Sequence, residues 1–351
     1  MAKLFYHDKP IIGLDISQTG IKIMSIDSKR WLVLGYGSVD LDPVKMQESL
    51  KSNDDYLANN IKSLLSEGLI GNLASDHVAI GIPTSRTFSR TFKLPIKSES
   101  TLSDAVQVEV DQYIPVPFSS LYVDYKIIER NKENATTIMC AIPKLLIDSC
   151  IKAVNSAGLR PVVIEPGINA TARILEITEE AQLTTLIIDI GSSGTDIAIF
   201  DNGAIRITGG ISIGGNTFTL EIAKKLGTTV ENAHQLKVLS GLSAGPRQAK
   251  IVGALKPSLQ KILSESRKVI RYYNERISDS SKIAQVLIVG GGSNVPGIGD
   301  YFTNDLIMAA RVASPWQKLD FGKLPHPNEH FRPRYISVSG LAIINPQDVL
   351  K

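Results

Sequence analysis

Two aspartates, Asp15 and Asp189, stand where an apolar segment gives way to a turn of small residues. A carboxylate at the end of a buried strand costs free energy unless it faces a cleft, a cation or several hydrogen-bond donors. The small residues that follow leave backbone N–H groups free to point outward, and such concave sets of donors suit phosphate oxygens. The pattern predicts two loops that grip one polyphosphate from both sides, with Asp15 and Asp189 holding a hydrated Mg²⁺ between them.

Both turns belong to one segment that occurs twice in the chain. Residues 11–27 read as an apolar strand, a turn and an alternating second strand, and residues 186–201 repeat this design in one register without gaps. In that register Asp15 falls on Asp189. The residues expected to contact phosphate are Ser17, Gln18, Thr19, Gly20, Gly191, Ser192, Ser193 and Thr195.

Each turn has a simpler explanation when it is taken alone. Asp, Ser and Gly also satisfy the geometry of a tight hairpin, and short turns of this composition are common. The duplication argues against that explanation. Two copies at one long interval indicate two related α/β lobes rather than a solenoid, whose repeats are short and numerous.

Composition narrows the class of protein. The 351 residues are 43% hydrophobic, which is enough to bury the cores of two or more subdomains. The net charge of +3 is too small to favour nucleic acid as a main partner. No apolar run approaches the roughly 20 residues that span a bilayer, and Cys140 and Cys150 form no CxxC pair. We therefore expect a cytoplasmic protein.

A third loop follows the apolar segment 285–289 and contains Gly290, Gly291, Gly292 and Ser293. Three glycines let another body approach the backbone closely. The loop fails as a dinucleotide fingerprint, because Val295 stands where a third glycine is needed. Together with the two hairpins, it resembles in order and separation the adenosine loop and the two phosphate loops of actin-like ATPases.

Within that superfamily the chain resembles the PilM family of type IV pilus assembly proteins, and it is similar to the FtsA cell-division proteins. The resemblance covers nearly the full length. It includes a middle segment typical of both groups, carried by residues 86–95, 106–110, 112–117, 123–126 and 141–161. It implies an α/β fold of the actin-like (ribonuclease H-like) type, with two lobes and an inserted FtsA-type (SHS2-like) domain.

The resemblance also implies how the chain is divided. The first lobe is expected at residues 1–83, 164–182 and 337–351, and the inserted domain at residues 84–163 interrupts it. The second lobe is expected at residues 183–222 and 283–336, with a helical subdomain at residues 223–282.

The adenosine contacts implied by the resemblance are Gly215, Glu221, Lys225, Lys237, Gly290, Gly291, Gly292 and Ser293. A solvated charged face explains Lys225 equally well. The chain departs from the family pattern at Ser17, where glycine is usual, and at His234, where glutamate is common. These departures bear on the geometry of the phosphate loop and on the expected ribose contact of Lys237.

Glu165 is the candidate for the residue that orients a water molecule toward the γ-phosphate, since it resembles the Glu-Pro segment of several actin-fold ATPases. Phosphoryl transfer depends more on such positioning than on a strong base. The competing interpretation is that Glu165 bonds the turn before the following helix. Relatives hydrolyse ATP feebly, so at most a slow ATPase is expected.

The function implied is that of an ATP-binding cytoplasmic scaffold of the type IV pilus or a related machine. In relatives, a groove involving the inserted domain binds the cytoplasmic N-terminal tail of the membrane partner PilN. Other platform proteins of the inner membrane are further expected partners, membrane association is expected only through partners, and self-association is left open. One alternative is an FtsA-like division protein, disfavoured because no linker and amphipathic anchor follow residue 341. The other is a small-molecule kinase of the same superfamily.

Overall fold

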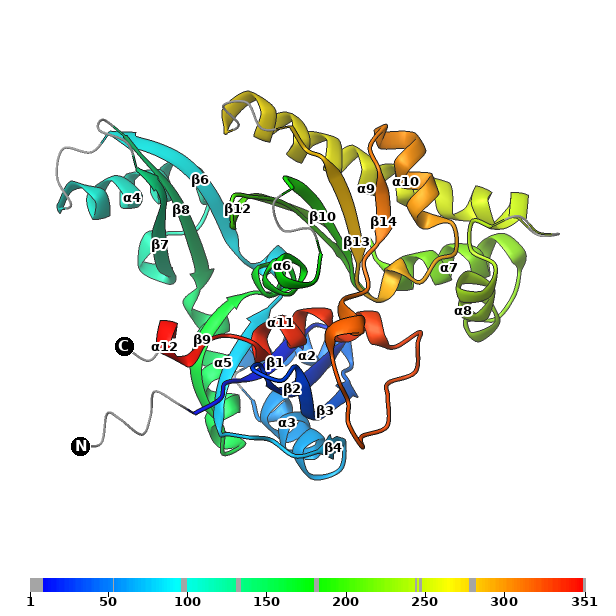
Figure 1. Cartoon of the computed structure of the whole chain (residues 1–351), viewed down its shortest axis with the longest axis horizontal. Coiled ribbons are helices and arrows are strands. Elements are labelled where there is room, and N and C mark those ends of the chain that lie inside the picture. The colour runs from blue at the N-terminus through cyan, green and yellow to red at the C-terminus, as the bar shows by residue number, and fades with distance from the viewer. Residues whose placement is uncertain are drawn as a thin grey trace.

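The computed structural model describes residues 9–349 except 53, 96–99, 131–133, 180–182, 244, 246–247 and 278–281. Three sheets organise these residues, and Figure 1 shows two of them stacked with helices between them. Among the helices of the described ranges, none is long and apolar enough to cross a membrane.

The first lobe is built on a six-stranded sheet of order β4-β3-β2-β1-β5-β9. Its first three strands form an antiparallel meander, and the other two long strands run parallel to β1. The strands are β1 (Ile12–Ser17), β2 (Gly20–Asp27), β3 (Leu32–Asp40), β4 (Leu69–Gly71), β5 (His77–Ile82) and β9 (Arg160–Pro166).

The second lobe repeats this plan in a five-stranded sheet of order β12-β11-β10-β13-β14. Asp15 of β1 pairs with Lys22 of β2, and Asp189 of β10 pairs with Asp196 of β11. The internal repeat therefore corresponds to two hairpins of identical register. The strands are β10 (Thr185–Ile190), β11 (Thr195–Asp201), β12 (Ala204–Ile211), β13 (Gln285–Val289) and β14 (Ala310–Val312).

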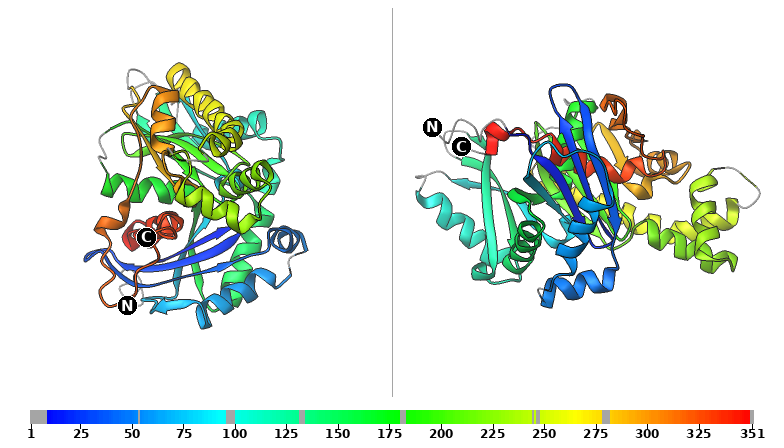
Figure 2. Two further views of the ribbon diagram at one scale, coloured as in Figure 1. Left: turned by 90° about the vertical axis from the view of Figure 1, so that its right-hand side faces the viewer. Right: turned by 90° about the horizontal axis from the view of Figure 1, so that it is seen from below.

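Two helices, α6 (Gly167–Thr178) and α11 (Ile336–Ala342), fill the space between the sheets. Their buried residues share one core with apolar residues of both sheets. The left view of Figure 2 shows α11, in red, between the blue strands of the first lobe and the green second lobe. The two helices touch through their backbones, because a Cβ on Gly340 would stand 1.9 Å from the carbonyl oxygen of Ala170.

The outer faces of the two sheets carry the remaining large helices. In the first lobe these are α2 (Pro43–Ser52), α3 (Tyr56–Ser66) and α5 (Lys144–Ser156). In the second lobe they are α7 (Gly215–Leu226), α8 (Val230–Leu239), α9 (Gln248–Arg276) and α10 (Ile298–Leu306). The expected helical subdomain at 223–282 thus holds the end of α7 with α8 and α9, and it shares the core of the second lobe.

The inserted domain is smaller than the sequence suggested. It comprises β6 (Phe88–Pro95), α4 (Ser100–Tyr113), β7 (Leu121–Arg130) and β8 (Asn134–Pro143), with its own core around Val110. The expected end at residue 163 is wrong. Helix α5 buries Cys150 and Val154 in the core of the first lobe, and β9 pairs with β5.

The chain also returns to the first lobe before residue 337, the position at which the sequence predicted the return. Asp320 forms a bridge with Leu32 of β3, and the Tyr36 hydroxyl donates to the carbonyl of Pro325 at 2.6 Å. Phe321 and Tyr335 pack against Tyr36 edge to face. This segment, with the short helices η4 (Pro315–Lys318) and η5 (Arg332–Tyr335), therefore belongs to the first lobe. Helix α12 (Pro346–Val349) follows α11.

Candidate functional site

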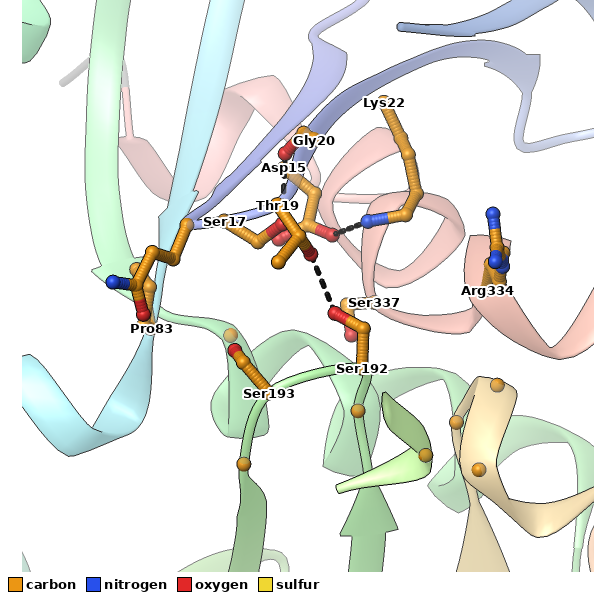
Figure 3. Close-up of a pocket in the computed structure, with 18 of the residues that line it drawn as sticks. Asp15, Ser17, Thr19, Gly20, Lys22, Pro83, Ser192, Ser193, Arg334 and Ser337 are labelled. Carbon is orange, nitrogen blue, oxygen red and sulfur yellow. Dashed lines mark hydrogen bonds and ion pairs between the residues drawn. The ribbon is translucent and has the colours of Figure 1, made fainter. Parts of the chain in front are cut away.

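A cavity of about 460 Å³ lies between the two lobes, where the two repeated hairpins face each other. Figure 3 shows Thr19 and Ser192 meeting across it, with their hydroxyl oxygens 2.5 Å apart. Most of the predicted nucleotide and metal residues line this cavity: Asp15, Ser17, Gln18, Thr19, Gly20, Asp189, Gly191, Ser192, Ser193, Gly215, Lys237, Gly290, Gly291 and Gly292.

The first hairpin places an acid, a base and a hydroxyl side by side. Lys22 Nζ donates to Asp15 Oδ2 at 2.9 Å, and both side chains are largely buried. Ser17 Oγ donates to the carbonyl of Gly20 at 2.8 Å, which closes the turn (Figure 3). The ammonium of Lys22 therefore lines the cavity beside the first turn, and a charge-assisted bond from it to an anionic oxygen would be strong.

The second hairpin carries two buried carboxylates. Burial raises the pKa of Asp189 to about 6, while a hydrogen bond of 3.1 Å from the Thr171 hydroxyl opposes the rise. Burial also raises the pKa of Asp196 to about 7, and the neighbouring charge of Asp189 adds to this rise. The two residues are register partners on β10 and β11, so their side chains leave the sheet next to each other on the same face.

The carboxylates of Asp15, Asp189 and Asp196 line the cavity together, and Lys22 is paired with Asp15. A divalent cation beside these carboxylates would offset their mutual repulsion. It would also favour their ionised forms over the protonated forms that burial favours. Among the described residues, no group of three or more acidic, histidine or cysteine side chains is arranged to ligate a metal directly. The donor set thus fits a hydrated Mg²⁺ that also binds phosphate oxygens.

The third loop forms the far wall of the cavity. Gly290 has φ +83, and a Cβ there would stand 2.3 Å from Asp189 Oδ1. Lys237 donates to the carbonyl of Gly215 at 2.9 Å and to the Thr219 hydroxyl at 2.8 Å. Burial, with the nearby Arg334, lowers the pKa of Lys237 to about 8.

Four of the predicted contacts lie outside the cavity lining. Thr195 and Ser293 are buried and bond the carbonyls of Ile213 and Gly290, so their hydroxyls hold the loops rather than face the cleft. Glu221 and Lys225 lie on α7 outside the lining, and Lys225 is exposed. The charged-face interpretation therefore suits Lys225 better.

Glu165 does not line the cavity either. Both of its carboxylate oxygens accept hydrogen bonds from Arg173, at 2.7 and 2.8 Å. Arg173 also donates to the carbonyl of Gly340 in α11. The arrangement corrects the assignment of Glu165 as the water-positioning residue, because its carboxylate is held by α6 rather than presented to the cleft.

Lys22, Asp196 and Arg334 are among the lining residues that the sequence analysis missed. Lys22 and Asp196 occupy equivalent positions of the repeat, seven residues after Asp15 and Asp189, so the alignment of the two copies already contained the signal. Arg334 reaches the cavity from η5, beside Gly291, and no local pattern in the sequence marks it.

Two lobes built on one repeated hairpin, two helices between their sheets and a cleft lined by both hairpins define an actin-like protein. A family model described as type IV pilus assembly protein PilM matches residues 13–345. The chain belongs to this family.

Solved structures share the fold. The structure is similar to that of a PilM–PilN type IV pilus biogenesis complex, with a TM-score of 0.79 at 21% identity over 95% of this chain and 98% of the other. It is less similar to MreB5 of Spiroplasma citri bound to ADP, with a TM-score of 0.53 at 13% identity over 95% of both chains.

Among curated proteins, the cell-division protein FtsA of Neisseria meningitidis is 27% identical over 201 residues, which are 53% of this chain and 44% of that protein. FtsA of Borreliella burgdorferi is 25% identical over 212 residues, 55% of this chain and 50% of that protein. The chain thus spans about half the length of the curated relatives it matches.

Proposed function

We propose that the protein is an ATP-binding scaffold of the type IV pilus machine that carries the cytoplasmic tail of a PilN-like membrane partner. The observation that carries the nucleotide half of this proposal is the meeting of the two hairpins across one cavity at Thr19 and Ser192. The MreB5 protein of similar fold is described as bound to ADP, and the matching PilM structure is described as a complex with PilN.

In this proposal the triphosphate lies between the two phosphate loops. The turns at residues 17–20 and 192–193 turn their backbone N–H groups toward its oxygens, and Lys22 neutralises charge from the side of the first lobe. Asp15 and Asp189, joined by Asp196, hold Mg²⁺ through water. When bound, the ion would neutralise phosphate charge between the two hairpins.

The nucleoside lies against the glycine loop at the other end of the cavity. Gly290, Gly291 and Gly292 leave room for the base, and Arg334 and Lys237 border it. Since Glu165 is bound to Arg173, the arrangement favours nucleotide as a ligand that sets lobe closure over nucleotide as a rapidly consumed substrate. The protein is then held at the inner face of the cytoplasmic membrane through its partners.

Isothermal titration of Mg·ATP tests the nucleotide half. Asp189→Asn keeps the size of the side chain and removes its charge, and we expect it to lose at least ten-fold in affinity. Glu275→Gln, an exposed change on α9, is the matched control and keeps the affinity of the unaltered protein. Equal affinities for both variants would contradict the assigned metal site.

A fluorescent peptide with the N-terminal sequence of a PilN-like protein tests the partner half by anisotropy. We expect this peptide to bind the full chain saturably, and we expect a peptide of scrambled sequence not to bind. Absence of binding, with and without Mg·ATP, would remove the partner from the proposal and leave nucleotide binding untouched.

A further inference from the structure

The nucleotide cavity gathers acids at one end and basic groups at the other. Asp15, Asp189 and Asp196 lie at the two hairpins, whereas Lys237 and Arg334 line the cavity beside the glycine loop. Figure 3 shows Arg334 standing apart from Asp15. A phosphate chain with its metal ion would occupy the acidic end. A neutral ribose and base would then bring no anion to the basic groups at the other end.

Lys237 lies where the phosphate loops and the glycine loop meet. Its Nζ donates to the carbonyl of Gly215, whose backbone N–H donates to the carbonyl of Gly191 in the second phosphate loop at 2.9 Å. A Cβ on Gly215 would stand 3.5 Å from Lys237 Nζ and 3.5 Å from the Cα of Gly292. Because the sugar of a nucleotide joins its phosphates to its base, the sugar would pass beside Lys237.

The ammonium of Lys237 is held by neutral oxygens. The residue is only 4% exposed, and its two acceptors are the carbonyl of Gly215 and the hydroxyl of Thr219. An ammonium has three N–H donors, so a third remains for a ligand. The neighbouring charge that acts on it is another cation, since burial and then Arg334 lower the pKa of Lys237 to about 8.

His234 adds a third basic group to this end of the cavity. It lies three residues before Lys237 on α8, so the two side chains share one face of the helix, and both line the cavity. Burial and the charges of Lys237, Arg334 and His330 lower the pKa of His234. An anion at this position would offset the repulsion among these groups.

Arg334 approaches the same end from the first lobe. Its Cγ lies 3.1 Å from the position of the Cβ that Gly291 lacks, so the side chain covers the backbone of the glycine loop. Its ion-pair partner, Asp40, lies 3.9 Å away and is 90% exposed, so solvent screens this pair. The forked N–H donors of a guanidinium match the oxygens of a phosphate.

We propose that the site takes a nucleotide whose ribose carries a phosphate in addition to the 5′ chain, and that Lys237, Arg334 and His234 bind this ribose phosphate. The inference rests on the proposed nucleotide site and names the class of nucleotide that fits it. The 5′ phosphates lie at the hairpins as before. The ribose phosphate supplies the anion that a simple nucleotide would leave missing at the basic end.

Adenosine 2′,5′-bisphosphate and adenosine 3′,5′-bisphosphate, each compared with AMP by isothermal titration in Mg²⁺, test the proposal. We expect at least one bisphosphate to bind at least ten-fold more tightly than AMP, because the ligands differ only in the ribose phosphate. If Mg·ATP binds and neither bisphosphate binds more tightly than AMP, this inference is wrong and the nucleotide site stands. If no nucleotide binds, Mg·ATP included, the proposed function fails together with it.

Variants locate the ribose phosphate. Arg334→Gln should remove most of the gain in affinity from AMP to the bisphosphate, Arg334→Lys should keep part of the gain, and His234→Gln should reduce it. Lys256→Gln, an exposed change on α9 outside the cavity lining, also removes one positive charge and should leave the gain intact. An unchanged circular-dichroism spectrum verifies that Arg334→Gln is folded. Equal gains in Arg334→Gln and Lys256→Gln would overturn the proposal.

Discussion

At Gly290, the absence of a side chain is what allows the cleft to form. Its φ of +83 and the 2.3 Å separation from Asp189 Oδ1 that a Cβ would impose leave room only for hydrogen. The loop can therefore pass directly behind a buried carboxylate. A side chain there would displace Asp189 from the position in which it faces Asp15 and the cavity.

Gly290→Ala should lower the free energy of unfolding by about 3 kcal/mol or more, because left-handed strain and a steric clash add together. Gly158→Ala is the matched control, with φ +82 and nothing within 4 Å of the added Cβ. That change should cost only about 1–2 kcal/mol of strain. Urea unfolding measures the free energy of unfolding of both variants. Similar losses of stability would show that neighbouring residues move and relieve the clash in Gly290→Ala.

Glu165→Gln should leave the Mg·ATP affinity within about two-fold of the unaltered protein, because the carboxylate is bound by Arg173 outside the cleft. It should lower the free energy of unfolding by about 1–3 kcal/mol, since a charge-assisted, partly buried pair is lost. Calorimetric titration and urea unfolding separate the two effects. A large loss of Mg·ATP affinity with unchanged stability would indicate that Glu165 contacts the nucleotide in the cleft.

At the scale of elements, β10 and β11 hold Asp189 and Asp196 side by side, and their packing couples folding to protons. Both folded-state pKa values lie above the ordinary value of 3.8, at about 6 and about 7. Between pH 3.8 and about 7 the folded protein therefore binds more protons than the unfolded chain. The stability that these two carboxyl groups contribute is present at low pH and is lost as the pH rises through this range.

We expect the nucleotide-free protein to lose stability from pH 4 to pH 7, with a contribution of up to about 1.4 kcal/mol per pH unit from each carboxylate. Asp196→Asn should flatten this slope, whereas Asp300→Asn, an exposed change on α10, should not. Urea unfolding at several pH values checks it. A slope that Asp196→Asn does not alter would contradict the raised pKa.

The sequence predicted the elements that repeat and missed those that depend on distant packing. The two hairpins follow from matched apolar runs and turns, so their strands and phosphate loops could be located. The apolar face of α5 is a local property, but the sheet against which it packs is not, so the inserted domain was drawn too long. Arg334 reaches the cleft because residues 313–335 cross between lobes without regular periodicity.

At the scale of the whole molecule, the inserted domain and the helices α7 and α8 lie at opposite ends (Figures 1 and 2). The inserted domain is tied to the second lobe by Arg206, which is only 3% exposed. Its guanidinium donates to the carbonyl of Asp201 and to Glu129 of β7, at 3.0 and 2.8 Å. This contact joins β7 of the inserted domain to β12 of the second lobe.

Glu129→Gln should loosen the inserted domain without unfolding the lobes, because Arg206 keeps its bonds to Asp201. We expect faster amide exchange in β7 and unchanged exchange in β13, measured by mass spectrometry. The exposed change Glu275→Gln serves as control. Equal exchange of β7 in both variants would show that other contacts hold the domain.

The contact between Gly340 and Ala170 limits how the lobes can move. Helices whose main chains touch cannot slide past each other without a steric clash, so α6 and α11 form one rigid pair between the sheets. We therefore expect the lobes to rotate about these two helices rather than to shear along them. A small rotation there becomes a larger displacement at the outer rims, where the inserted domain meets β12.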